Sequence, residues 1–177
     1  MTTSTHILRR RRFLPLFVTQ LFNAFNDNLY KTAMVLFVVY VVYNSEAEEA
    51  MFSAVASGVF ILPFFVLSAL AGQLADMSDK ARIVRVVKAC EIGIMAVGGA
   101  GLLIAWQDVE CAAAAGRCLL EPHAALADMA IPLLLAALFA MGVHSTFFGP
   151  IKYAILPQHL KPEEVLAGTG LVEAGTY

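Results

Sequence analysis

The chain has 177 residues, of which 59% are hydrophobic and 15% are charged. A soluble domain carries about 45–50% apolar and about 25% charged residues, because polar groups must cover its surface. Disordered chains are poor in large apolar residues, and charge-driven nucleic-acid binders are basic, whereas this chain has a net charge of −2. Three cysteines are too few for a disulfide scaffold. The composition therefore predicts an integral membrane protein that binds no nucleic acid.

Four segments are long and apolar enough to cross a bilayer as helices, which takes about 20 mostly apolar residues each. They cover residues 13–43, 51–75, 83–106 and 126–149. A fifth apolar segment begins at Val165 and runs to Tyr177, which is too short to cross. We predict an all-α membrane protein with a basic tail at residues 1–12. Residues 13–177 then form a partial transmembrane domain of four full helices and the start of a fifth.

The basic residues gather on one side of this predicted topology. That side holds Arg9, Arg10, Arg11, Arg12, Lys80, Arg82, Arg85, Lys88, Lys152 and Lys161. The other side holds Arg117 and most of the acidic loop residues. Because cytoplasmic loops are rich in Lys and Arg, the amino terminus and the loop around Lys80 are predicted to be cytoplasmic. The arginine run also resembles a twin-arginine export signal, but the apolar stretch after it is long, charged and without a clear cleavage site.

The first predicted helix carries a stripe of polar residues. Gln20, Asn23, Asp27 and Lys31 are separated by three or four residues, so they share one helical face, and Asn28 follows Asp27. Asp27 and Lys31 are predicted near the bilayer midplane, where each opposes insertion by about 2.5–3.5 kcal/mol. The favoured interpretation is an ion or substrate path along Asn23, Asp27, Asn28 and Lys31. The alternative is an Asp27–Lys31 pair that only locks helix packing.

Polar residues in the later helices are weaker candidates. Lys88 and Glu91 are three residues apart and can pair, and a structural role is favoured for Glu91. His144 is either a polar contact in a cavity or a packing residue. Side chains of adjacent helical residues point about 100° apart, so His144 and Ser145 cannot form a nucleophile–base pair.

The loop between the second and third predicted helices carries a motif. Residues 72–82 read GQLADMSDKAR. A glycine lets two helices approach closely, an aspartate can cap a helix, and basic residues anchor the loop at an anionic membrane surface. The segment resembles the signature loop of the major facilitator superfamily, although Met77 and Asp79 depart from the family pattern. The resemblance implies a loop that governs conformational exchange, with Gly72, Asp76, Lys80 and Arg82 as its key residues.

Two further segments narrow the resemblance. Residues 22–28 (FNAFNDN) and 148–156 (FGPIKYAIL) resemble the A-F-x-D-N and P-x-K-Y-G-I-L segments of bacterial lysophospholipid transporters, with Ala154 in place of a glycine, and residues 170–174 continue the likeness. This family has about twelve helices, so the chain is similar to its amino-terminal third. It also occurs fused to a phospholipid acyltransferase.

The resemblance implies a function. A member of this family would move lysophospholipids, such as lysophosphatidylethanolamine, across the bacterial inner membrane, with membrane lipids and the remaining helices as partners. Lys31 and Lys152 are then expected to bind phosphate, and Asp27 to couple transport to a sodium or proton gradient. The chain itself is not expected to be an enzyme. Alternatives are the membrane part of a fused acyltransferase, or a major facilitator for another solute.

Cofactors and metals are not predicted. The chain has no phosphate-binding glycine loop, so an ion gradient rather than ATP is the expected energy source. Cys111, Cys118 and His123 match no common zinc spacing. Because their loop is predicted on the oxidising side, a Cys111–Cys118 disulfide is the better interpretation.

Overall fold

The computed structural model of the chain describes residues 6–43, 46–113 and 124–176, and these residues form helices joined by short turns, with no strand among them. Their elements are α2 (Leu14–Phe37), the π-helix η1 (Val38–Tyr43), α3 (Glu46–Met77), α4 (Lys80–Ala113), α5 (Ala124–Ala154), α6 (Leu156–His159) and α7 (Pro162–Ala174). The all-α class predicted from the sequence is confirmed for this part of the chain.

Three of these helices are long and apolar enough to cross a membrane, over Glu48–Met77, Lys80–Cys111 and Asp128–Ala154. They indicate membrane association, as the composition predicted. α2 and η1 cover the first predicted span, residues 13–43, but α2 is not in this set. Its polar stripe, which includes Asp27 and Lys31, lowers its hydropathy below that of the other three. In the described part of the chain, three of the four predicted spans are therefore long and apolar enough to cross a membrane.

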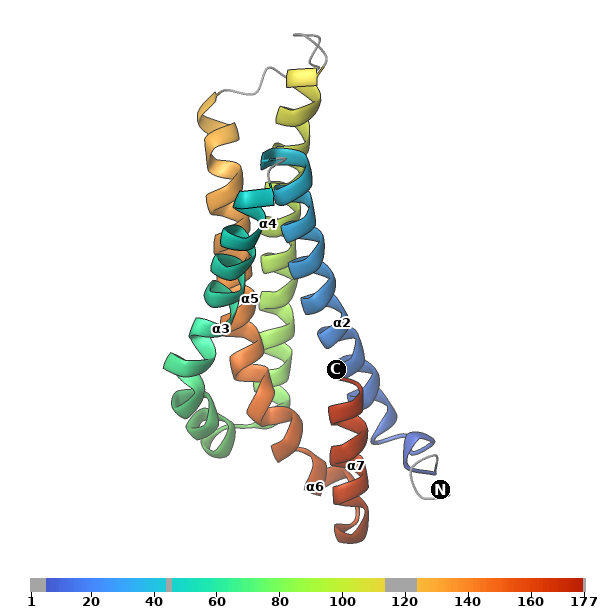
Figure 1. The fold of residues 1–177 in the computed structure, drawn as a ribbon. Helices are drawn as coiled ribbons and strands as arrows, with labels where there is room; N and C mark the ends of the chain where they lie inside the picture. Colours follow the sequence, from blue (N-terminus) through green and yellow to red (C-terminus); the bar gives the residue numbers. More distant parts are fainter. Residues whose placement is uncertain (1–5, 44–45, 114–123, 177) are drawn as a thin grey trace.

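The long helices run alternately up and down (Figure 1). The amino-terminal segment, the turn between α3 and α4, and α6 lie at the lower end of the view, which we call the basic end because Arg9–Arg12, Lys80, Arg82 and Lys161 are there. α7 starts at the basic end and turns back beside the lower part of α2 (Figure 1). The structure thus gathers at one end the loops whose basic residues set the predicted topology.

The larger apolar core lies between α2, α3 and α5, away from the basic end. Its buried members include Met34, Val38, Phe52, Leu138 and Met141. Tyr30 of α2 reaches across this core and donates a hydrogen bond from its hydroxyl to the carbonyl oxygen of Leu134, at 3.2 Å. On its other side the Tyr30 ring lies against Gly98 of α4, where an added Cβ would come within 2.5 Å of the ring.

A second core ties the amino-terminal segment to α6 and α7. Ile7, Phe13, Leu156, Leu160 and Val172 are its buried residues. Arg10 forms an ion pair with Glu164 at 2.5 Å, and the Glu164 carboxylate also accepts a hydrogen bond from the backbone N–H of Lys161 at the start of α7. Ile7 and Arg10 therefore attach the predicted basic tail to α6 and α7, while Arg9, Arg11 and Arg12 stay exposed.

α3 and α5 approach closely where α3 contains a proline. Pro63 cannot donate a backbone hydrogen bond, and the ribbon of α3 bends between its teal and green parts (Figure 1). Gly142 of α5 faces this bend: an added Cβ would lie 2.3 Å from the carbonyl oxygen of Phe60 and 3.2 Å from the Pro63 ring. The absence of a side chain at Gly142 is what allows the two helices to touch here.

We expect Gly142→Ala to destabilise the protein by about 1–3 kcal/mol, because the α3 backbone must move away from the new methyl group. Thermal unfolding in detergent measures the effect. The matched control is Gly58→Ala in α3, where an added Cβ meets nothing within 4 Å, so this substitution should be neutral or stabilising. Equal melting temperatures for the two variants would contradict the close contact.

Candidate functional site: a polar cluster between α2, α4 and α5

The Asp27 carboxylate joins α2 to α5. Asn23 lies one turn before it on the same face of α2 and donates to its Oδ2 at 3.2 Å, while the Ser145 hydroxyl of α5 donates to the same oxygen at 2.5 Å. The other oxygen, Oδ1, is buried and has no hydrogen-bond partner in the described structure. Oδ1 therefore lacks the hydrogen-bond partner that a buried carboxylate oxygen normally has.

α4 contributes an ion pair that touches the same group of residues. The Lys88 ammonium donates to Asn23 Oδ1 at 2.5 Å and to Glu91 Oε2 at 2.6 Å. The second oxygen of Glu91 accepts a hydrogen bond from Asn26 of α2 at 3.1 Å. The pairing of Lys88 with Glu91 predicted from their spacing is confirmed. A chain of contacts thus runs from Asp27 through Asn23 and Lys88 to Glu91.

His144 extends this chain on α5. It is 4% exposed, and its Nε2 lies 3.6 Å from Glu91 Oε2. Neither ring nitrogen has a hydrogen-bond partner in the described part of the chain. We refer below to the polar cluster, which consists of Asn23, Asn26, Asp27, Lys88, Glu91, His144 and Ser145.

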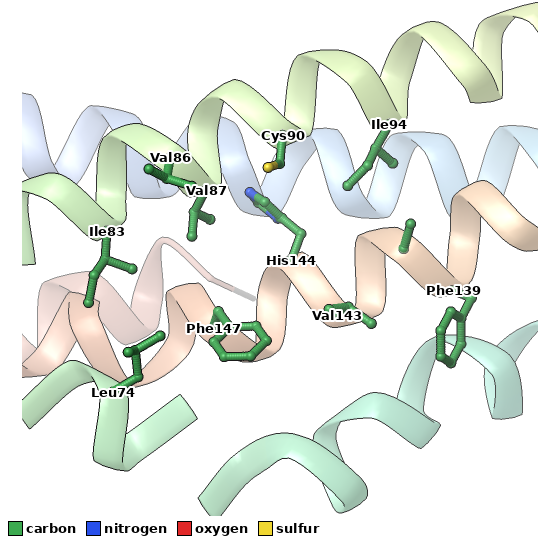
Figure 2. A pocket seen from close by; sticks show the side chains of 11 residues that line it. Leu74, Ile83, Val86, Val87, Cys90, Ile94, Phe139, Val143, His144 and Phe147 are labelled. Carbon is green, nitrogen blue, oxygen red and sulfur yellow. The ribbon is translucent and has the colours of Figure 1, made fainter. Parts of the chain in front are cut away.

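An apolar cavity of about 460 Å³ lies beside His144, between α3, α4 and α5. Figure 2 shows the imidazole extending from α5 toward Cys90 of α4, with Val87 and Phe147 nearby. The remaining lining residues are Leu74, Ile83, Val86, Ile94, Phe139, Ala140 and Val143. His144 is thus the polar group between an apolar cavity on one side and the Lys88–Glu91 pair on the other.

A second cavity, of about 520 Å³, opens on the Asp27 side of the polar cluster. Its polar lining is Gln20, Asn23, Asp27, Asn28, Ser145, Lys152 and Thr176, and its apolar lining includes Phe60, Ile61, Phe64 and Phe148. Thr176 accepts hydrogen bonds from Lys152 at 3.2 Å and from Gln20 at 2.9 Å. Four of the predicted path residues, Asn23, Asp27, Asn28 and Lys152, therefore border one cavity.

Lys31 is separate from this group. Its ammonium lies 5.6 Å from the centre of the Phe60 ring of α3, and it does not line the cavity. No ion pair joins Lys31 to Asp27 in the described structure, so the alternative of an Asp27–Lys31 lock is wrong there. Asp27 turns toward α5, whereas Lys31, one turn later, turns toward α3. The cation that reaches Asp27 through a shared hydrogen-bond partner is Lys88.

The sequence did not indicate that Lys88 and Ser145 lie beside Asn23 and Asp27, and it favoured only a structural role for Glu91. Near the basic end, a lysine in the first turns of α4 is expected to extend to the membrane surface. The i, i+3 spacing to Glu91 was the available signal that it points inward instead. Ser145 gave no signal, because a hydroxyl in an apolar helix commonly bonds to its own backbone.

The segment at residues 72–82 differs from its predicted arrangement. The aspartate that caps α4 is Asp79, whose Oδ1 accepts a hydrogen bond from the backbone N–H of Ala81 at 2.9 Å. Asp76 is exposed and caps no helix in the described structure. Around Gly72 an added Cβ would meet nothing within 4 Å, so no close helix approach occurs there. Lys80 and Arg82 lie in the first turn of α4, at the basic end.

We expect Asp79→Ala to cost about 1 kcal/mol of stability, because the Ala81 N–H loses its partner at the start of α4. Asp76→Asn, three residues earlier, removes a charge without removing a cap and should change stability by less than about 0.5 kcal/mol. Denaturant unfolding of both variants in detergent compares them. A larger loss for Asp76→Asn would show that Asp76 rather than Asp79 supports the helix.

The cysteine prediction stays a prediction. Cys111 is disulfide-bonded, but Cys118 and His123 lie outside the described residues, so the pairing of Cys111 with Cys118 is still an expectation. Across the described part of the chain, no group of His, Cys, Asp or Glu side chains is arranged to hold a metal ion.

No protein-family model matches the chain, and no curated protein or solved structure matches it. Ser145 donates its hydroxyl proton toward Asp27 and not toward His144, so the two neighbours are not arranged as a nucleophile and its base. A half-paired carboxylate, an ammonium group and apolar walls around one cavity are suited to binding a charged amphiphile or a cation.

Proposed function

We propose that the chain forms part of a secondary transporter that moves lysophospholipids across the bacterial inner membrane and uses a gradient of sodium ions or protons. The observation that carries the proposal is the cavity of about 520 Å³, which Asp27 and Lys152 border together. Ionisable side chains within apolar helices are costly to insert, and they usually mark the path of an ion or substrate.

The chemistry of a lysophospholipid fits the lining of this cavity. Lysophosphatidylethanolamine has a phosphate, an ammonium group and one acyl chain. Lys152 supplies a compact positive charge for the phosphate, and Oδ1 of Asp27, which has no hydrogen-bond partner in the described structure, can accept the ammonium group. Phe60, Phe64 and Phe148 supply an apolar wall for the chain. A zwitterion with an apolar tail therefore offers one group to each part of this lining.

Uptake of labelled lysophosphatidylethanolamine into proteoliposomes that contain the full-length protein tests this proposal. We expect saturable uptake that an imposed ion gradient stimulates. Lys152→Gln should reduce uptake by about tenfold, equivalent to 1.4 kcal/mol of lost interaction. The matched control is Lys161→Gln, which removes an exposed lysine at the basic end. Absence of uptake by the unsubstituted protein under every gradient, or equal uptake by the two variants, would overturn the proposal.

The proposed orientation has its own test. Because basic loops are retained in the cytoplasm, the basic end is expected to face the cytoplasm and the start of α3 to face outward. A membrane-impermeant thiol reagent applied to intact cells should therefore modify Glu48→Cys and leave Lys80→Cys unmodified. Lysed cells, in which both positions should react, serve as the control. Labelling of Lys80→Cys alone in intact cells would reverse the orientation.

A further inference from the structure

The charges of the polar cluster can form two complete pairs if one proton is added. With neutral His144, the cluster contains the carboxylates of Asp27 and Glu91 and the ammonium group of Lys88. Lys88 is bound to Glu91 directly and reaches Asp27 only through Asn23. A proton on the imidazole would give two groups of each sign, and buried charges are stable only when they are paired.

His144 is the group in the cluster that lacks hydrogen bonds. Both of its ring nitrogens are buried without a partner in the described structure, although a buried polar atom normally has one. Its Nε2 lies 3.6 Å from Glu91 Oε2, a distance that suits an ion pair but is too long for a hydrogen bond. At this distance the charge of an imidazolium can pair with the Glu91 carboxylate through Nε2, whereas a neutral imidazole gains no ion pair from it.

We propose that His144 and Glu91 form a proton-binding site, and that a proton bound there transfers Lys88 from Glu91 to Asp27. The proton comes from a hydronium ion, which becomes water as the new N–H bond forms on the imidazole. The imidazolium then pairs with Glu91. The Lys88 ammonium group, which already donates a hydrogen bond to Asn23, leaves Glu91 and pairs with Asp27, the neighbouring partner of Asn23. The inference names the coupling ion of the transporter, so in that respect it rests on the proposed function.

The neighbours of His144 on each packed helix agree with this assignment. α4 presents Lys88, Glu91 and Cys90 to it. α2 contributes Asp27, which reaches α5 through Ser145, the residue next to His144. α3 contributes only the apolar Leu74 to the cavity beside the imidazole. Among the described residues, Glu91 is thus the carboxylate that directly faces His144, and Lys88 is the cation that competes with it.

Infrared difference spectra of the purified full-length protein, recorded on acidification, test the site without any transport assay. We expect one component of the imidazolium signal to be lost in His144→Gln and retained in His159→Gln, a control at the partly exposed histidine of α6. Glu91→Gln should also lose this component, because it removes the carboxylate that the imidazolium would pair with. This second variant keeps the test decisive if His144→Gln does not fold.

The competing site is Asp27 itself, and the same spectra distinguish it. If the proton binds there, acidification will produce a protonated-carboxyl signal that disappears in Asp27→Asn, while His144→Gln leaves the spectrum unchanged. That result would overturn the inference. Retention of the imidazolium signal in Asp27→Asn together with its loss in His144→Gln would support it.

Transport then separates the inference from the proposed function. In proteoliposomes, His144→Gln should lose the stimulation by a pH gradient at least tenfold and keep counterflow of labelled lysophosphatidylethanolamine, which needs no gradient. Full stimulation in His144→Gln would overturn the inference and leave the proposed function intact. If the unsubstituted protein showed no uptake, the proposed transport of lysophospholipids would be overturned. The spectra would still decide whether the proton site exists.

Discussion

Asp27→Asn is expected to abolish the response of lysophospholipid uptake to an imposed ion gradient in the full-length protein. Asparagine has nearly the same shape as aspartate and can still bond to Asn23 and Ser145, so the helices should stay in place. It carries no charge, so neither a cation nor the Lys88 ammonium group has a carboxylate to pair with at this position. The coupling should be lost while the site remains formed.

Gradient-driven uptake and thermal stability are to be measured side by side. At saturating substrate we expect the stimulation to fall at least tenfold, while the melting temperature stays close to that of the unsubstituted protein. Asp108→Asn, at an exposed aspartate near the far end of α4, is the matched control and should behave as the unsubstituted protein does. A well-folded Asp27→Asn protein with normal gradient dependence would show that Asp27 has only a structural role.

The sequence alone could predict which face of the first helix is polar, because residues three or four apart must share a face. It could not predict what that face meets. Asn23 and Asp27 contact α4 and α5, whereas Lys31 lies over Phe60 of α3. Helices cross at an angle, so one stripe passes different neighbours along its length. For this reason the alternative interpretation, an Asp27–Lys31 pair, does not hold in the described structure.

The sequence alone also could not predict which aspartate in residues 72–82 caps α4. The motif contains Asp76 and Asp79, and either can cap a helix by composition. Which one does so depends on where α3 ends, and in the structure it continues to Met77. Asp79 then directly precedes α4 and bonds to Ala81. Helix ends are set within one or two residues by local hydrogen bonds, which a pattern of residue types does not determine.

The three apolar spans were predictable, because length and hydropathy decide them. The polar cluster was predictable only in part. Its charged members could be recognised in the sequence, because charged residues are costly to insert into a bilayer. Their partners, however, come from helices far apart in sequence: Lys88 is 65 residues from Asn23, and Ser145 is 118 from Asp27. Contacts of this kind depend on the depth and rotation of each helix, which only the folded structure supplies.

Lys88→Met should cause the largest loss of stability among these variants. The Lys88 and Glu91 side chains are 25% and 14% exposed, so both charges are largely removed from water. Removing the lysine leaves two carboxylates, Glu91 and Asp27, within one cluster and also leaves Asn23 Oδ1 without its donor. Breaking one side of a buried ion pair costs about 3 kcal/mol or more, which lowers the melting temperature by about 6 °C or more in a chain of this size.

A double-mutant cycle separates the value of the pair from the cost of an unpaired charge. In Lys88→Met/Glu91→Leu neither charge remains, so the double variant should be more stable than Lys88→Met alone, because a buried pair replaced by apolar residues is often neutral in stability. Lys161→Met, at an exposed lysine, is the control and should change stability by less than about 0.5 kcal/mol. If Lys88→Met melts at the same temperature as this control, Lys88 is not held in the cluster, and the transfer of its charge between Glu91 and Asp27 has no basis.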